Sequence, residues 1–255
     1  MLRPAARRLG GFAALALAVP CWCADLQVSP ILLQFTATDK AQALWLTNTG
    51  ARPVAAQVRA YAWTQMEDED HLDPTQALVA SPPLVNVAPG QSQLVRIVRR
   101  PAPASTREEG FRLIVDELPL ADEAPATDAP PATEAGRNGL RLLLRYSIPA
   151  FVGSDGGAQR PDAKQVAAAW TPGEHPLLTI SNQWTRRLRI TTVVHEDAAG
   201  RRTVIVPGLL GYVLAGQKRR FALPAAAQDL GPGVIKARLY EALEEFPLAT
   251  VARGS

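Results

Sequence analysis

The chain contains 255 residues, of which 47% are hydrophobic and 20% charged, and its formal net charge at pH 7 is +3. This length suits two domains, each large enough to hold a hydrophobic core. Three of the 27 basic residues precede residue 24, which leaves 24 basic against 24 acidic side chains in the remainder. Nucleic-acid binding needs a concentrated basic patch, so this balance argues against a nucleic-acid partner.

The N-terminus has the pattern of a secretory signal. Three arginines precede a short apolar run over residues 12–19, and the small residues Cys21 and Cys23 suit the positions before a cleavage site. We therefore predict a signal peptide over residues 1–23, a mature chain that begins near Ala24, and export to the bacterial periplasm.

Two further interpretations of the leader compete with this one. Acylation of Cys21 would give a lipoprotein, although Pro20 is a poor neighbour for it, and the pair Arg7-Arg8 also occurs in twin-arginine export signals. After Ala24 no apolar run approaches the roughly 20 residues of a membrane helix, so we do not expect a membrane-embedded protein. Both cysteines fall within the leader, so the mature chain depends on burial for its stability.

The first half of the mature chain is predicted to form β-strands, because apolar and polar residues alternate between turns. Residues 54–63 present one small apolar face, and residues 84–98 predict a hairpin around the turn Ala88-Pro89-Gly90-Gln91. In the strand over residues 26–35 the apolar phase slips by one residue at Pro30. Because such a slip exchanges the two faces, we predict an edge strand that leaves one sheet at Pro30 and joins the other.

The end of the first half combines a loop with a further strand. Residues 120–139 are rich in Ala, Pro, Asp, Glu and Thr and lack an apolar period, which predicts a mobile loop. The strand over about 139–149 carries large apolar groups on one face and arginines on most of the other. Residues 151–157 have the composition of a linker and divide the mature chain into domains over 24–150 and 158–255.

The second half resembles a degenerate copy of the first. The segment LTISN at 178–182 is similar to LWLTN at 44–48, and LAGQ at 214–217 is similar to VAPGQ at 87–91. Two β-sandwiches in tandem, an all-β fold, are the simplest interpretation.

The sequence contains no recognisable catalytic or metal-binding constellation. His71, His175 and His195 lack metal-ligand spacing and are interpreted as plain surface histidines, and Ser154 lacks the spacing of a nucleophile elbow. We therefore expect no enzymatic activity, no cofactor and no metal. Arginines within the predicted strands are a sharper signal: one alone is usually solvated, but several in one cleft would suit a carboxylate.

Several segments, in their order and spacing, resemble the periplasmic pilus assembly chaperones over nearly the whole mature chain. These segments are VSP at 28–30, LTNTG at 46–50, SPP at 81–83 followed by VAPGQ at 87–91, and RYSIP at 145–149. The YSIP ending and the WTQ segment at 63–65 are most similar to the archaic chaperone-usher subfamily.

The resemblance implies two immunoglobulin-like β-sandwich domains in a boomerang arrangement. It implies a protein that binds, folds and caps pilus or fimbrial subunits lacking their last strand, before an outer-membrane usher receives them. The chaperone lends its own strand, here about 139–149, by β-augmentation. The implied donor side chains are Leu140, Leu142, Leu144 and Tyr146. The resemblance also allows the free protein to self-associate by covering this exposed strand.

The sequence departs from the family at the basic pair that anchors the subunit's terminal carboxylate, because Leu32 and Leu144 occupy those places. The candidate substitutes are Arg112, which leads, and then Arg141 and Arg145. The family's acidic residue that helps fix the domain angle matches Glu117, but its expected basic partner falls at Ile148.

A structural or adhesive subunit of a surface fibre is the competing hypothesis. A fibre subunit should carry its own donor segment at the mature N-terminus and often a disulfide. Here residues 25–35 run straight into a predicted sandwich strand, and no cysteine follows Cys23. We therefore favour the chaperone.

Overall fold

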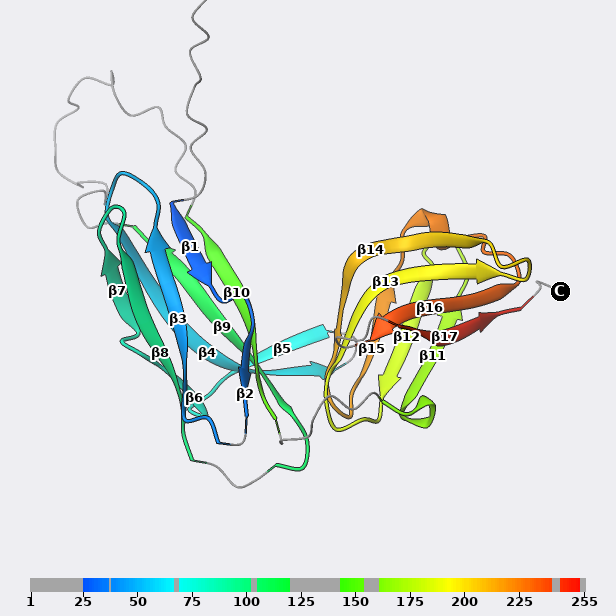
Figure 1. The fold of residues 1–255 in the computed structure, drawn as a ribbon, viewed down its shortest axis with the longest axis horizontal. Coiled ribbons are helices and arrows are strands. Elements are labelled where there is room, and N and C mark those ends of the chain that lie inside the picture. Colours follow the sequence, from blue (N-terminus) through cyan, green and yellow to red (C-terminus); the bar gives the residue numbers. More distant parts are fainter. Residues whose placement is uncertain are drawn as a thin grey trace, which may run out of the picture.

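The computed structural model describes residues 25–36, 38–66, 69–101, 105–119, 143–153, 161–239 and 244–252. Almost all regular structure in these ranges is β-strand, arranged as two lobes that meet at an angle (Figure 1). The first lobe contains strands β1 to β10 and the second contains β11 to β17. The all-β, boomerang-like arrangement expected from the sequence is confirmed.

The first domain is a sandwich of two sheets. One sheet has the order β1-β3-β8-β6 and contains β1 (Leu26–Ser29), β3 (Ala41–Asn48), β8 (Ser92–Arg99) and β6 (Leu78–Ser81). The other has the order β2-β10-β9-β4-β5, with β7 also paired to β4, and contains β2 (Leu33–Phe35), β10 (Arg145–Val152), β9 (Glu109–Leu118), β4 (Val54–Met66), β5 (Glu69–Pro74) and β7 (Leu84–Val87). Apolar side chains of both sheets, among them Leu46, Val58 and Leu113, enclose the core.

The second domain is a smaller sandwich with its own core, which includes Leu178, Ile190 and Ile235. Its sheets have the orders β11-β12-β15 and β14-β13-β16-β17. The strands are β11 (Val166–Thr171), β12 (Leu177–Asn182), β13 (Leu188–Asp197), β14 (Arg202–Val213), β15 (Lys218–Ala222), β16 (Gly233–Leu239) and β17 (Glu245–Val251), with short 3-10 turns at η2 (Ala163–Gln165) and η3 (Ala225–Ala227).

The first strand changes sheets at Pro30, as the phase slip predicted. Before the proline, β1 pairs with β3 in one sheet, and Leu26 opposes Asn48. After it, β2 runs parallel to β10 in the other sheet, and Leu33 opposes Ala150. Leu26 and Leu33 are both buried, so the slip lets one segment supply the core from each side.

The internal repeat is confirmed by two equivalent buried asparagines. The Asn48 side-chain amide donates to the carbonyls of Arg52 and Val87, at 2.7 and 2.8 Å. The Asn182 amide donates in the same way to Arg186 and Val213, at 2.8 and 3.0 Å. Each asparagine therefore fastens the end of its strand to one loop carbonyl and to the last carbonyl of another strand, β7 or β14.

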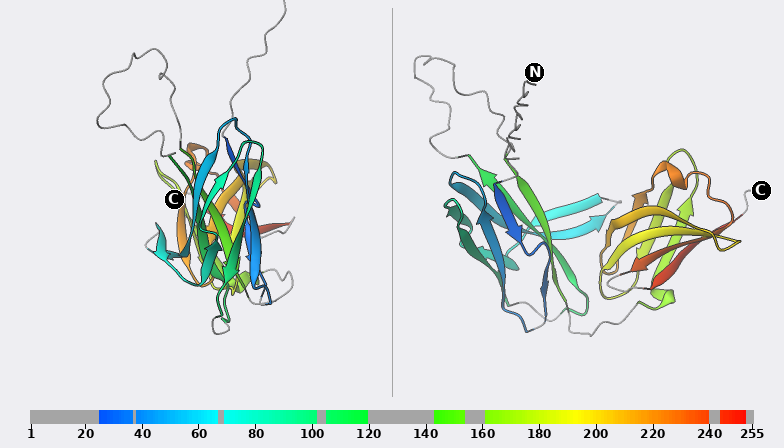
Figure 2. Two further views of the ribbon diagram at one scale, coloured as in Figure 1. Left: turned by 90° about the vertical axis from the view of Figure 1, so that its left-hand side faces the viewer. Right: turned by 45° about the horizontal axis from the view of Figure 1, so that its top comes forward.

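Strand β4 and its neighbour β5 form a long hairpin that projects from the first domain toward the second (Figures 1 and 2). In the first half of β4 the buried positions are Val54, Ala56 and Val58, which face the first core. Near the tip the buried positions are Trp63 and Gln65, in the opposite phase. The hairpin therefore buries one face in its own domain and the other at the domain interface.

The structure differs from the sequence predictions at the expected hairpin, at His195 and at the end of β10. The hairpin expected over residues 84–98 is wrong in its pairing, because β7 pairs with β4 whereas β8 pairs with β3 and β6, so the turn connects the two sheets. His195 is buried rather than exposed. Strand β10 continues to Val152, into the start of the expected linker, while residues 120–142 and 154–160 lie outside the described residues.

Candidate functional site

A cavity of about 530 Å³ lies between the two domains. Strands β4, β5, β9, β10 and the β1–β2 crossing line it from the first domain, and β13, β14 and β15 line it from the second. Its charged residues are Asp70, Arg112, Arg187, Arg189 and Arg219. Its apolar wall includes Ile31, Leu32, Trp63, Leu209 and Tyr212. The lining therefore carries more guanidinium groups than carboxylates, which makes the cavity an environment for an anion.

Arg112 comes from the middle of β9 and is partly buried. Its guanidinium carbon lies 3.8 Å from the centre of the Trp63 ring, a cation–π stack that fixes the plane of the fork. Burial lowers the pKa of this guanidinium, although the nearby Asp70 opposes that shift. Within the described residues Arg112 forms no hydrogen bond or ion pair with a carboxylate.

Two of the cavity's arginines are already paired with carboxylates of the first domain. Arg187 donates to Glu108 at 2.6 Å, and both side chains are almost fully buried, with 2% and 5% exposure. The Arg187 guanidinium also stacks on Phe151, with 3.8 Å between the guanidinium carbon and the ring centre. Arg219 forms an ion pair with Asp70. These two pairs hold the second domain against the first.

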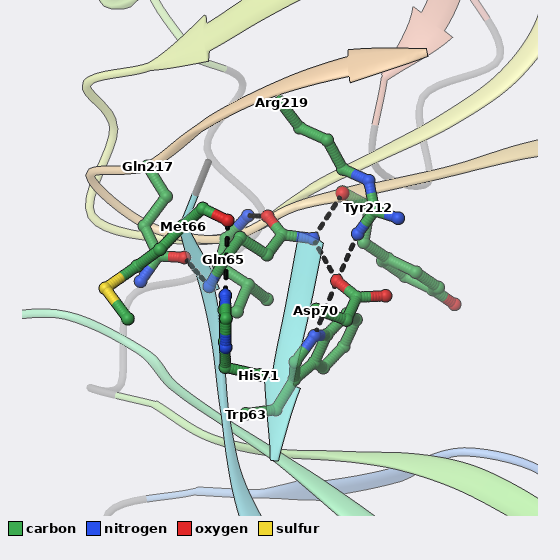
Figure 3. A network of polar contacts seen from close by, with 9 residues as sticks. Trp63, Gln65, Met66, Asp70, His71, Tyr212, Gln217 and Arg219 are labelled. Atoms are coloured by element: carbon green, nitrogen blue, oxygen red, sulfur yellow. Dashed lines mark hydrogen bonds and ion pairs between the residues drawn. The ribbon is translucent and has the colours of Figure 1, made fainter. Parts of the chain in front are cut away.

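The tip of the β4–β5 hairpin adds a polar network to this interface (Figure 3). The Gln65 side chain donates to the Tyr212 carbonyl at 3.0 Å and accepts from the Leu214 backbone N–H at 2.9 Å. Its backbone N–H donates to the Gln217 side chain at 2.6 Å. Asp70 accepts from the Trp63 indole N–H at 2.9 Å and from the Gln65 amide at 3.1 Å. Gln65 therefore binds the second domain through its backbone N–H and through both the nitrogen and the oxygen of its side-chain amide.

Three aromatic rings close the apolar side of the interface. Trp63, Phe151 and Tyr212 lie with ring centres 5.7 to 5.9 Å apart, and Leu214 is buried with them. Trp63 and Phe151 belong to the first domain and Tyr212 to the second. The cluster excludes water from one wall of the cavity, which strengthens the electrostatic interactions inside it.

The cavity adjoins an unpaired sheet edge. On the side of β10 away from β9, strand β2 pairs only with Ala150 to Val152. Residues 145–149 have no strand partner on that side among the described residues, and Ser147 and Pro149 line the cavity. Ile31, which is 79% exposed, lies at the same place. A strand added along this edge would reach the arginines.

The proposed donor side chains divide between the interior and the surface. Leu140 and Leu142 lie outside the described residues. Tyr146 packs against the core of its own domain, and its hydroxyl donates to the Leu26 carbonyl. Leu144 is partly exposed, whereas Leu143, in the alternate phase, is 47% exposed. The exposed apolar side chain of the described segment is therefore Leu143.

The three anchor candidates occupy different surroundings. Arg112 lines the cavity, Arg141 lies outside the described residues, and Arg145 pairs with Asp116 on the outer face of the sheet. Burial alone would raise the pKa of Asp116, but hydrogen bonds from Arg145 and Arg59 outweigh it and hold the pKa below its usual value. Arg145 is therefore already engaged by a carboxylate of its own domain.

Glu117 lies near the end of β9, beside the donor segment. Its side chain accepts from the Leu144 backbone N–H at 3.4 Å, and Ile148 faces the first core. Glu108 and Asp70 make the ion pairs that cross the interface. The carboxylates seen to pair across the domain interface are therefore Glu108 and Asp70, and the match of Glu117 to the family's acidic residue stays a prediction.

Comparison with known protein families matches residues 25–157 to the pili and flagellar-assembly chaperone family, PapD N-terminal domain. The match spans the whole first domain and more than half of the chain. The chain belongs to this family. A comparison with curated proteins finds no significant match.

Solved structures of pilus chaperones share the two-domain fold. The CsuC–CsuE chaperone–tip adhesion subunit complex of archaic Csu pili from Acinetobacter baumannii includes a chain 20% identical, with a TM-score of 0.64 over 89% of this chain and 99% of that one. The YadV chaperone is 16% identical, with a TM-score of 0.60 over 88% and 100%. The Salmonella enterica SafA pilin–SafB chaperone complex includes a chain 17% identical, with a TM-score of 0.57 over 89% of this chain and 96% of that one.

Sequence reasoning found one cavity arginine and missed three. Leu32, at a place where family members were expected to carry a basic residue, lies in the cavity wall. Arg187, Arg189 and Arg219 come from the second domain, to which no site was assigned. The run Arg186-Arg187-Leu188-Arg189 was a usable signal, because three arginines within four residues concentrate positive charge at the start of a strand.

Among the described residues, no helix is long and apolar enough to cross a membrane. The same ranges contain no group of three or more His, Cys, Asp or Glu side chains arranged to hold a metal.

Proposed function

We propose that this protein is a periplasmic chaperone that binds pilus subunits by donor-strand complementation and passes them to an outer-membrane usher. Family membership supports a role in pilus assembly. The solved complexes of the CsuC chaperone with a tip adhesion subunit and of the SafB chaperone with a pilin support subunits as the ligand class. The N-terminal signal pattern supports the periplasm.

The observation that carries this proposal is the continuity between the free edge of β10 and the arginine-lined cavity. The edge offers unpaired backbone groups over residues 145–149, and a subunit strand can use them for main-chain hydrogen bonds. The cavity at Ser147 and Pro149 offers guanidinium groups at the end of that strand. Backbone pairing thus supplies affinity, and the cavity fixes where the bound strand ends.

The charge of the cavity also sets the direction of the bound strand. Chain direction along β10 runs from Arg145 toward Pro149 and the cavity. A strand bound parallel to β10 would place its C-terminal carboxylate among the arginines, whereas an antiparallel strand would place its ammonium group there. Arg187 and Arg219 are engaged by Glu108 and Asp70, and the remaining cavity arginines favour the carboxylate, so we propose parallel pairing with Arg112 as the anchor.

Capture of subunits by Arg112 variants tests the anchor. A charge-assisted, bidentate contact should contribute about 1.5 to 3 kcal/mol. Arg112→Ala should therefore raise the Kd for a native subunit by roughly tenfold or more, since about 1.4 kcal/mol corresponds to a tenfold change in Kd. Arg112→Lys should recover only part of the loss, because an ammonium lacks the fork. The matched control is Arg96→Ala, an exposed strand arginine outside the cavity.

Loss of the Trp63 stack could affect folding, so the same variants are measured with a subunit extended by several residues at its C-terminus. Extension removes the carboxylate from its place and should weaken wild-type capture. Arg112→Ala should then be no worse than wild type. Equal losses on native and extended subunits, or no loss on either, would contradict the anchor. Failure to co-purify any small secreted β-protein from periplasm would contradict the chaperone function itself.

A further inference from the structure

A second arginine of the cavity is as free of carboxylate partners as Arg112. Arg189 lies on β13 of the second domain, is partly buried, and forms no ion pair or hydrogen bond with any described carboxylate. Arg112 lies on β9 of the first domain. The other two cavity arginines, Arg187 and Arg219, pair with Glu108 and Asp70. One unpaired guanidinium therefore comes from each domain.

The charges facing these two arginines explain why an anion should bind between them. The cavity lining contains one carboxylate, Asp70. It forms an ion pair with Arg219 and accepts hydrogen bonds from Trp63 and Gln65. Glu108 is fixed by the buried Arg187 pair. Asp70 is the carboxylate whose charge reaches Arg112, and it is already engaged by Arg219, whose own charge acts against Arg112. The partly enclosed cavity therefore keeps an excess of positive charge that an entering anion would offset.

We propose that Arg112 and Arg189 hold one subunit carboxylate between them, so that the anchor is built from both domains. This inference rests on the proposed function and adds the second-domain residue that completes the site. A carboxylate has two oxygens and about four acceptor positions, enough for a fork from each side. Arg189 is thus a specificity-determining residue for subunit capture.

A shared anchor ties subunit binding to the relative placement of the domains. Arg112 and Arg189 meet one carboxylate only while the β4–β5 hairpin keeps its contacts with Tyr212, Leu214 and Gln217. The hairpin therefore acts as a strut that positions the two halves of the site. Separated domains would each retain one guanidinium and lose the bidentate arrangement.

A double-mutant cycle with a native and a C-terminally extended subunit tests the shared anchor. Arg189→Ala should weaken capture of the native subunit by about tenfold, as should Arg112→Ala, by the magnitude of hydrogen bonds to charged groups. The double variant should lose less than the product of the two effects, because both arginines hold the same carboxylate. On the extended subunit neither variant should lose affinity. Arg238→Ala, exposed on neighbouring β16 and outside the cavity lining, is the matched control.

A second measurement needs no subunit. The free chaperone, labelled with 15N-arginine, is titrated with N-acetyl-tetraalanine or with its C-terminal amide. The side-chain Nε–H resonances of Arg112 and Arg189, assigned from the Ala variants, should both shift with the carboxylate and stay in place with the amide. Arg189→Ala should also weaken the shift of Arg112.

The outcomes separate the two proposals. If Arg112→Ala weakens native capture while Arg189→Ala equals Arg238→Ala and the Arg189 resonance does not move, the shared anchor is wrong and the Arg112 anchor stands. If neither arginine affects capture, the proposed carboxylate site is wrong as a whole. Equal losses with Arg189→Ala on native and extended subunits would assign Arg189 to domain packing and overturn the inference.

Discussion

Asp70 of the first domain and Arg219 of the second form an ion pair at the tip of the β4–β5 hairpin, beside the cavity that holds Arg112. Burial alone would raise the pKa of Asp70, but the hydrogen bonds from Trp63 and Gln65 and the charge of Arg219 outweigh it, so the pKa lies below its ordinary value. The pair therefore serves two purposes: it fixes the domains relative to each other, and it occupies a guanidinium that would otherwise add to the positive charge of the cavity.

Asp70→Asn should loosen the domain contact without unfolding either sandwich, because Gln65 and Trp63 keep their other partners. We expect a wider distribution of interdomain distances in small-angle scattering and a lower melting temperature for the coupled transition. Asp73→Asn is the control, an exposed carboxylate on the same strand. Identical scattering from the Asp70 and Asp73 variants would show that the ion pair does not hold the domains.

The lowered pKa of Asp70 also predicts a pH dependence. A carboxylate whose pKa is lower in the folded protein contributes stability above its unfolded pKa of about 3.9, and that contribution is lost as the pH falls through the folded value. Wild type should therefore lose its interdomain rigidity on acidification below about pH 4 more than Asp70→Asn does. Parallel acid titrations of the two proteins, followed by scattering, measure the difference; the same midpoint in both would contradict it.

Glu108 and Arg187 form the more deeply buried ion pair of the interface, with 5% and 2% exposure. Glu108 also accepts from the Arg187 backbone N–H at 3.0 Å. Glu108→Ala leaves a buried guanidinium without its counter-charge, which should cost about 3 to 5 kcal/mol of unfolding free energy. Urea unfolding measures this, with Glu109→Ala as the control because Glu109 is the exposed next residue on β9. A loss no larger than that of the control would mean that water reaches Arg187.

The sequence predicted the features that depend on local alternation. The strand character of β4, the sheet change at Pro30 and the repeated asparagine at 48 and 182 all follow from the spacing of apolar residues and turn residues. The pairing of β7 could not be predicted in this way, because adjacent strands joined by a tight turn pair in a hairpin but also cross between the sheets of a sandwich, and the turn sequence is the same.

The interdomain site is built from residues that lie far apart in the sequence. Arg112, Arg187 and Arg219 are separated by 75 and 32 positions, and only the placement of one domain against the other brings them to one cavity. The long hairpin was also missed beyond Trp63. Its tip buries Trp63 and Gln65 in the phase opposite to the first half of β4, so an alternation counted from Val54 assigns both residues to the surface.

Tyr146 ties the edge strand to the opposite sheet through its hydroxyl, which donates to the Leu26 carbonyl. Tyr146→Phe keeps the ring against the core and removes this one hydrogen bond, so the unfolding free energy should fall by about 1 kcal/mol. Subunit capture should be unchanged if the side chain faces its own core. Tyr61→Phe, on β4, is the comparison: it removes a hydroxyl that interacts with the half-exposed Arg59, so its loss should cost less. Normal stability with weakened capture would place Tyr146 in the subunit groove instead.

Leu143 and Leu144 test which phase of the donor segment contacts the subunit. Leu143 is 47% exposed, whereas Leu144 shares the phase of Tyr146 and Ile148, which contact the first core. A donated apolar side chain enters the groove of the partner, and an aspartate there would be buried without a partner group, at a cost of several kcal/mol. Leu143→Asp should therefore leave the melting temperature of the free chaperone within about 2 °C of wild type, by the usual scale for exposed substitutions, and lower subunit recovery by at least tenfold.

Leu144→Asp should instead destabilise the free chaperone, because its phase is turned toward the sandwich. Leu143→Met, which keeps an apolar side chain of similar volume, is the control and should retain capture. The reverse pattern, a destabilised Leu143→Asp and a stable Leu144→Asp that fails to capture, would assign Leu140, Leu142 and Leu144 as the donor face.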